Sequence, residues 1–217
     1  MSEYSEDEQW ERAKAWLRSN GVWIAGGLVL GVALLNGWWW YQKRLETQAE
    51  TASARYEEMV DAFSRNDITR GLTLADELNR DFKSTPYAAL SSLIAARAHV
   101  EANELDKAAA SLNSVMDDAT DEDIQMIARL RLARVQSAQG KHDDALATLT
   151  LPEAGDFAPR IADVRGDVLL AKGDRDGALK EYLAARDGAD DGLVDADLLD
   201  LKIRDLGGSP PARAEES

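Results

Sequence analysis

The sequence of 217 residues contains no cysteine and only two histidines. Without cysteine the chain has no disulfide framework, no thiol-based active site and no cysteine-ligated zinc or iron–sulfur centre. The two histidines, His99 and His142, lie far apart in the sequence and do not favour a histidine-rich metal site. Basic residues are also scarce, with 25 lysines and arginines against 40 aspartates and glutamates. The net charge of −15 argues against a nucleic-acid binder.

The short motifs of common enzyme classes are missing as well. The chain has no GxSxG, no P-loop, no Rossmann glycine run and no HExxH. An acidic cluster at Asp117, Asp118 and 121–123 lacks the DxDxDG spacing of a calcium loop. Thr120 with Asp123 instead fits the N-cap and first turn of a helix. We therefore expect no enzymatic activity, no metal and no cofactor.

One long uncharged stretch, residues 19–42, lies near the N-terminus. Its apolar part, GVWIAGGLVLGVALLNGWWWY at 21–41, matches the ~20 residues that a helix needs to cross a bilayer. Trp and Tyr side chains at 38–41, followed by basic residues at 43–44, are typical of a membrane interface. The run exceeds the ~7–15 residues of a signal peptide and ends in bulky side chains. We predict an uncleaved transmembrane helix over 21–41.

Two features inside this span suit a helix–helix contact. Gly27 and Gly31 stand four residues apart, a spacing that lets two helices approach closely. Asn36 is the one strongly polar side chain of the span and can hydrogen-bond a partner helix. The alternatives stay open, because glycine is common in transmembrane helices and Asn36 can lie near the wet interface. Three basic residues flank the span on each side, so the positive-inside rule does not decide its orientation.

Residues 1–20 precede the span and carry a helix-start signal. Ser5 and Glu8 fit a capping box, and apolar residues follow at helical spacing. The Asn20–Gly21 pair is a typical helix stop. These signals predict a short amphipathic helix over 5–19 at the membrane surface. A frayed leader that only positions the span is the alternative.

A pattern of small residues recurs through the rest of the chain. Each repeat has a small residue at the first position of the pattern. Glycine or asparagine follows seven residues later, a second small residue follows after five more, and a large apolar residue follows after another four. Small residues leave room where two helices cross, and glycine or asparagine accepts the left-handed conformation that often ends a helix. This is the tetratricopeptide pattern. The three matching repeats are Ala96, Asn103, Ala108, Leu112; Ala133, Gly140, Ala145, Leu149; and Gly166, Gly173, Ala178, Tyr182.

The pattern predicts an all-α chain, with a single N-terminal transmembrane helix followed by a tetratricopeptide-like right-handed helical repeat domain over 42–206. We expect about four helix pairs, including a degenerate first repeat near 46–81 whose small-residue register is poor. Apolar residues at helical spacing over 193–206 predict a C-terminal capping helix. The tail at 207–217 begins with GGSPP and is predicted to be disordered.

In this architecture the first helices of successive repeats line a concave surface. Arg97 and Arg134 take the same repeat position and are expected to stack along the groove. Arginines beside apolar side chains suit an extended peptide with acidic groups or a C-terminal carboxylate. The aliphatic members of the set could instead be inter-helix core. The predicted groove residues are Leu90, Leu93, Arg97, Ile127, Leu130, Arg134, Arg160 and Asp163.

The order of these features, an acidic tail, an anchor ending in Trp and Tyr, and a degenerate repeat domain, is specific. Together with three stretches of sequence it resembles the ancillary SecYEG translocon subunit family, the YfgM-like proteins of Gram-negative bacteria. The resemblance spans residues 3–206, and the VRGDVLLAKGD part of it is the most specific. The stretches are YAALSSLIAARAHVEANELDKAAASL (87–112), LRLARVQ (130–136) and IADVRGDVLLAKGD (161–174).

That resemblance implies an inner-membrane protein with a cytoplasmic N-terminus and a periplasmic repeat domain. The implied partners are the SecYEG channel, a PpiD-like periplasmic chaperone and nascent secreted polypeptides that leave the channel. Some members are linked to control of an envelope-stress response regulator. Two other functions stay open: a membrane-anchored scaffold for other envelope complexes, and a regulator that binds a signalling protein. The tail after Gly207 is outside the resemblance.

Overall fold

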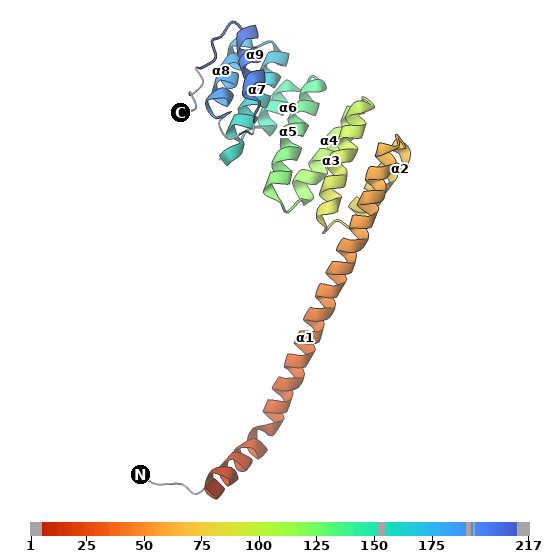
Figure 1. The fold of residues 1–217 in the computed structure, drawn as a ribbon, viewed down its shortest axis with the longest axis vertical. Coiled ribbons are helices and arrows are strands. Elements are labelled where there is room, and N and C mark those ends of the chain that lie inside the picture. The colour runs from red at the N-terminus through yellow and green to blue at the C-terminus, as the bar shows by residue number, and fades with distance from the viewer. Residues whose placement is uncertain (1–5, 152–154, 190–191, 193, 212–217) are drawn as a thin grey trace, which may run out of the picture. The chain divides into compact units, whose positions relative to one another are not determined.

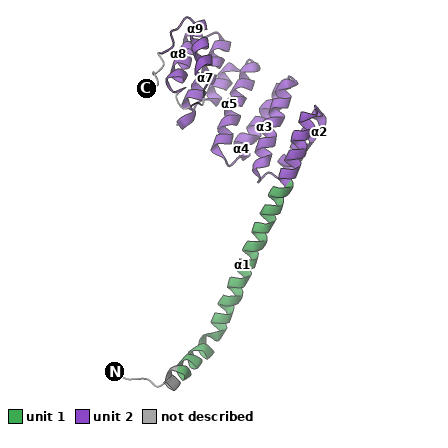
Figure 2. Ribbon diagram, viewed as in Figure 1, with its two compact units in different colours: residues 1–51 green, residues 52–217 purple. Residues whose placement is uncertain are grey.

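The computed structural model describes residues 6–151, 155–189, 192 and 194–211. Across those residues every regular element is helical (Figure 1). The chain divides into two compact units, residues 1–51 and residues 52–217 (Figure 2); residues 52–217 are called the repeat domain below. The helices are α1 (Glu6–Ser64), α2 (Ile68–Asp81), α3 (Pro86–Glu101), α4 (Leu105–Asp118), α5 (Glu122–Ala138), α6 (His142–Thr148), α7 (Ala158–Lys172), α8 (Arg175–Asp187) and α9 (Ala196–Asp205), with a 3-10 turn, η1 (Gly155–Phe157), before α7.

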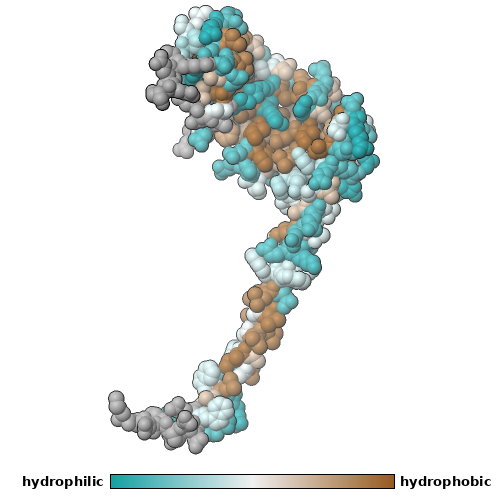
Figure 3. Space-filling model, in the orientation of Figure 1, coloured by the Kyte–Doolittle hydropathy of each residue, from teal (hydrophilic) through white to brown (hydrophobic). Residues whose placement is uncertain are grey.

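The part of α1 in the first unit is long and apolar enough to cross a membrane. Its most apolar 18-residue window has a mean hydropathy of 1.6 and none of it is buried by protein. Val22 is 83% exposed and Leu35 is 70% exposed, and Figure 3 shows apolar surface along the middle of this helix. Apolar surface of this extent without a protein cover suits the hydrocarbon of a bilayer.

Aromatic and basic residues pair at the C-terminal end of the apolar stretch. The Lys43 ammonium lies 5.2 Å from the centre of the Trp39 ring, and the Arg44 guanidinium lies 5.7 Å from that of Trp40. Such cation–π pairs suit the headgroup region, where a ring and a charge share one amphipathic environment. The membrane-spanning segment is predicted to end at Tyr41, just before these two basic residues.

The predicted helix stop at Asn20–Gly21 is wrong, because α1 continues through both residues. The Asn20 side chain donates to the carbonyl of Trp16 at 3.0 Å, so its amide is satisfied within the helix. One glycine costs a helix about 1 kcal/mol, whereas a break would leave several backbone groups without partners. The helix start predicted at Ser5 lies outside the described residues.

In the repeat domain the helices stack as successive antiparallel neighbours, with α3 on α4, α5 on α6 and α7 on α8 (Figure 1). The core is divided among these neighbours: one cluster joins Leu93 of α3, Leu112 of α4 and Leu132 of α5. The predicted crossing positions are buried. At Gly166 an added Cβ would lie 2.4 Å from the Tyr182 ring, so only glycine leaves room for the tyrosine.

One turn geometry recurs at the end of the first helix of every repeat. In each case a residue with positive φ is followed by a residue whose N–H donates to the carbonyl five positions earlier, at 2.8 to 2.9 Å. This is the Schellman C-cap, which favours glycine or asparagine. The left-handed residues are Asn66 (φ 63), Asn103 (φ 58), Gly140 (φ 77), Gly173 (φ 93) and Gly207 (φ 84).

The turn at Asn66 places the degenerate first repeat in register with the later repeats. Met59, Gly71 and Ala75 take the positions of Ala96, Ala108 and Leu112, and all three are buried. A methionine at the first small position hides the pattern. At Gly71 an added Cβ would lie 2.8 Å from the Phe63 ring, so the glycine leaves room for this phenylalanine.

The turn at Gly207 gives α9 the place of the first helix of a further repeat. Gly208 donates to the Ile203 carbonyl at 2.9 Å, so both glycines belong to the end of α9 rather than to a tail. Residues 212–217 lie outside the described residues. One predicted cap also shifts by a position, since Asp121 rather than Thr120 caps α5 by accepting from the N–H groups of residues 123 and 124.

Candidate functional site

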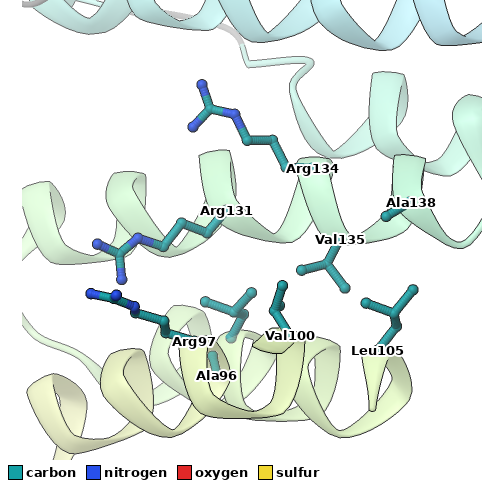
Figure 4. A pocket seen from close by; sticks show the side chains of 9 residues that line it. Ala96, Arg97, Val100, Leu105, Arg131, Arg134, Val135 and Ala138 are labelled. Carbon is teal, nitrogen blue, oxygen red and sulfur yellow. The ribbon is translucent and has the colours of Figure 1, made fainter. Parts of the chain in front are cut away.

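A cavity of about 290 Å³ lies in the repeat domain between α3, α4 and α5 (Figure 4). Its walls are aliphatic apart from three arginines that stand at its rim. Val100 is 43% exposed and contributes apolar surface at the cavity. Figure 3 shows apolar surface in the middle of the repeat domain on the face turned to the viewer. The lining residues are Ala96, Arg97, Val100, Leu105, Leu112, Arg131, Arg134, Val135 and Ala138.

The three arginines come from two neighbouring first helices. Arg97 projects from the last turns of α3, and Arg131 and Arg134 stand about one turn apart on α5. Figure 4 shows the guanidinium groups of Arg97 and Arg131 at the same end of the cavity, while Arg134 points away from them. Arg97 and Arg134 therefore line the same cavity, and Arg131 rather than Arg134 stands beside Arg97.

The three guanidinium groups differ in their partners. Nε of Arg97 donates to Glu101 at 2.8 Å, an exposed pair on one helix. A terminal guanidinium nitrogen of Arg134 lies 3.9 Å from a carboxylate oxygen of Asp163 on α7, which is a long ion pair. Arg131 makes a long contact of 3.5 Å with the Leu93 carbonyl, and within the described part of the chain no carboxylate lies within 4.0 Å of it.

This arrangement places Arg131 close to two other positive charges. Partial burial is the main cause that lowers the pKa of Arg131, and the positive charges of Arg97 and Arg134 lower this pKa further. Burial disfavours the charged form, and like charges nearby do the same. A bound anion would oppose both effects, and a carboxylate matches the planar fork of a guanidinium with two parallel hydrogen bonds.

The predicted groove residues separate into three groups in the structure. Leu93 is 7% exposed and Leu130 is 5% exposed, and both belong to core clusters. Leu90 is half-buried and Ile127 is 36% exposed, but neither lines the cavity. Of the eight, Arg97 and Arg134 are the two that the structure brings to this cavity, and Arg160 stays outside its lining.

Asp163 has a structural contact of its own. It is buried and accepts a hydrogen bond of 2.7 Å from Lys202 of α9. Lys202 also donates to Asp167 at 2.5 Å, and its ammonium lies 4.9 Å from the centre of the Tyr182 ring. A second pair, Arg186 of α8 with Asp200 of α9 at 2.8 Å, is also buried. These contacts fasten α9 to the last complete repeat.

Sequence reasoning did not single out Arg131. It occupies the repeat position of Ile94, so the repeat alignment gives no reason to expect a charge there. The available signal is its spacing of three residues from Arg134, which puts both on one face of α5.

The predicted contacts inside the span remain predictions. An added Cβ at Gly27 or Gly31 would meet nothing within 4 Å, so the surface beside both glycines is open. The Asn36 side chain donates to the carbonyl of Val32 at 2.8 Å. Its amide N–H is thus satisfied inside its own helix, and a partner is not required to satisfy it.

Comparison with known proteins covers both the apolar helix and the repeat domain. A family model described as a tetratricopeptide repeat-like domain covers residues 14–208. A protein named ancillary SecYEG translocon subunit from Escherichia coli is 35% identical over 204 residues, which cover 93% of this chain and 97% of that protein. Proteins of the same name from Neisseria gonorrhoeae and Haemophilus influenzae are 30% and 29% identical, over 93% and 83% of this chain and 97% and 88% of their own lengths. The chain therefore belongs to the family of ancillary SecYEG translocon subunits, with a tetratricopeptide repeat-like domain behind an apolar N-terminal helix.

Proposed function

We propose that this chain is a single-pass inner-membrane subunit of the Sec translocon whose repeat domain faces the periplasm. There it binds a PpiD-like chaperone and assists secreted polypeptides that leave the SecYEG channel. The observation that carries the proposal is the likeness to relatives of that name over 93% of the chain, with anchor and repeat domain both included. The unburied apolar part of α1 supports the membrane anchor.

The mechanism is positional. An anchor that stays at the channel keeps the repeat domain at high effective concentration near each emerging chain, so modest affinity is sufficient. The cavity between α3 and α5 offers apolar surface and positive charge inside an otherwise acidic protein. Both features suit short, transient contacts with polypeptides, and the absence of any enzyme motif agrees with a binding role.

Site-specific photo-crosslinking in cells tests this proposal. A photo-reactive amino acid replaces Ala138, an exposed alanine at the cavity, or Ala110, an exposed alanine of α4 that does not line it. We expect adducts with the chaperone or with secreted chains from position 138 and far fewer from position 110. Adducts from Val29, which is 68% exposed in the apolar stretch, should contain a channel subunit.

The outcomes separate the alternatives. Adducts of position 29 with cell-wall machinery, and none with the channel, would favour an envelope scaffold and overturn the proposal. Channel adducts from position 29 together with equal yields from positions 138 and 110 would keep the subunit at the translocon but remove the cavity from its mechanism.

A further inference from the structure

We propose that the cavity between α3, α4 and α5 binds the C-terminal residue of a polypeptide. The apolar side chain of that residue fills the cavity, and its α-carboxylate is held by Arg97 and Arg131. This inference deepens the proposed function and rests on it for the identity of the polypeptide as a secreted chain. The chemistry of the ligand is inferred from the geometry of the cavity.

The size of the cavity limits its occupant. At about 290 Å³ it lies at the lower end of the ~300–1,000 Å³ that small-molecule sites occupy. One or two apolar side chains fill such a space. Val100, Leu105, Leu112, Val135 and Ala138 provide an aliphatic wall, and no acidic side chain is part of the lining.

The charge at the rim defines the other half of the ligand. Arg97 and Arg131 present their guanidinium groups at one end of the cavity (Figure 4). The hydrogen bond from Arg97 to Glu101 uses Nε, so the two terminal nitrogens remain for another acceptor. Arg131 has a single long contact with a backbone carbonyl. The two guanidinium groups have no anion that they share. They form a positive site in a chain whose net charge is −15, and such a site attracts a carboxylate.

A chain end fits this site better than an internal acidic residue does. In a C-terminal residue the carboxylate and the side chain leave the same Cα, so anion and apolar group stand side by side, as the arginines and the cavity do. With an internal acidic residue, the carboxylate at the arginines and the apolar side chain in the cavity must come from two different residues. The polypeptide must also continue away from the site in both directions.

The binding test uses the full chain in phosphatidylcholine nanodiscs and a fluorescein-labelled peptide, Gly-Ser-Gly-Ser-Gly-Ala-Leu, with a free C-terminus. Fluorescence anisotropy compares it with the same peptide as a C-terminal amide. We expect the amide to bind about tenfold or more weakly, because a charge-assisted pair is lost. A third peptide, amidated and with an internal Leu-Asp pair, should bind as weakly as the amide.

Two variants locate the site. Arg131→Ala should weaken binding of the free acid about tenfold and leave the amide unchanged. Arg80→Ala, which removes the same charge from an exposed pair on α2, is the matched control and should change nothing. Thermal unfolding of each variant checks that the fold is intact.

Several results would overturn the inference: equal binding of acid and amide, no binding of either, or an unchanged affinity in the Arg131→Ala variant. Tight binding of the internal Leu-Asp peptide would assign the site to acidic segments instead of chain ends. The peptide assay needs no channel and the crosslinking assay needs no peptide. Failure of this inference is therefore distinguishable from failure of the proposed function.

Discussion

The contact between Gly166 and Tyr182 offers a quantitative test of how the repeats pack. In the Gly166→Ala variant the new Cβ would stand 2.4 Å from Cε1 and 2.6 Å from Cδ1 of Tyr182. Carbon atoms ordinarily approach to about 3.5–4.0 Å, so the ring must move by roughly 1 Å. Tyr182 is 1% exposed, and its hydroxyl donates to Asp167 at 2.9 Å, so the ring has little freedom to move.

The expected loss of stability follows from three contributions. Overpacking a core costs about 1–3 kcal/mol, and weakening the tyrosine hydrogen bond costs about 1 kcal/mol more. Alanine favours the helix over glycine by about 1 kcal/mol, which offsets part of this loss of stability. The free energy of unfolding of the repeat domain should therefore fall by about 2 kcal/mol, which lowers the midpoint of thermal unfolding by roughly 4–8 °C.

Thermal unfolding followed by far-UV circular dichroism measures this effect. Tryptophan fluorescence is unsuitable, because all six tryptophans lie at or before Trp40 and none is in the repeat domain. The Tyr182→Leu background provides the control, since the missing ring should make the alanine much less costly and yield a coupling energy. A Gly166→Ala variant as stable as the parent, or an identical cost in both backgrounds, would refute the packing argument.

Three further predictions concern the turns, the last helix and the anchor. Gly140→Ala should cost about 1 kcal/mol through left-handed backbone strain alone, while Gly140→Asn should cost less than half of that in the same thermal assay; equal costs would contradict the Schellman assignment. Lys202→Met leaves two partly buried carboxylates without their cation and should raise amide hydrogen exchange throughout α9. Unchanged exchange in α9 would show that apolar packing alone holds this helix. Replacing Gly27 and Gly31 together by leucine should reduce co-purification of SecYEG in mild detergent, whereas Gly26→Leu on another face should not; equal recovery from all variants would leave these glycines without a contact role.

The repeat architecture could be predicted because its constraints are local. Residues such as Ala133 and Gly173 are required where helices cross or where a helix ends, so they recur at fixed spacing. The first repeat escaped because Met59 stands where the other repeats have a small residue, and Ala75 stands where they have a large apolar one.

The site was predicted only in part, for a similar reason. Position within the repeat put Arg97 and Arg134 on the inner face, but it could not show that Leu93 and Leu130 point into the core. Which residues border a cavity depends on the spacing between helices, and sequence periodicity contains no such information. Arg131 was missed because the repeat position it occupies is apolar in the preceding repeat.

The helix stop predicted at Asn20–Gly21 failed because capping preferences are weak. They amount to about 1 kcal/mol, and in α1 the Asn20 amide finds its acceptor one turn back. Strong turn signals end helices mainly where the chain must reverse direction to pack, as it does after Asn66 and Asn103.

The orientation of the repeat domain is the most direct test of the account, because chains leave the channel on the periplasmic side. A tag at the C-terminus of the full-length protein is exposed to protease in intact cells, in spheroplasts and after lysis of the inner membrane. If the repeat domain lies in the periplasm, the tag is digested as soon as the outer membrane is opened. Protection until the inner membrane is lysed would place the repeat domain in the cytoplasm and contradict a role at the exit of the channel.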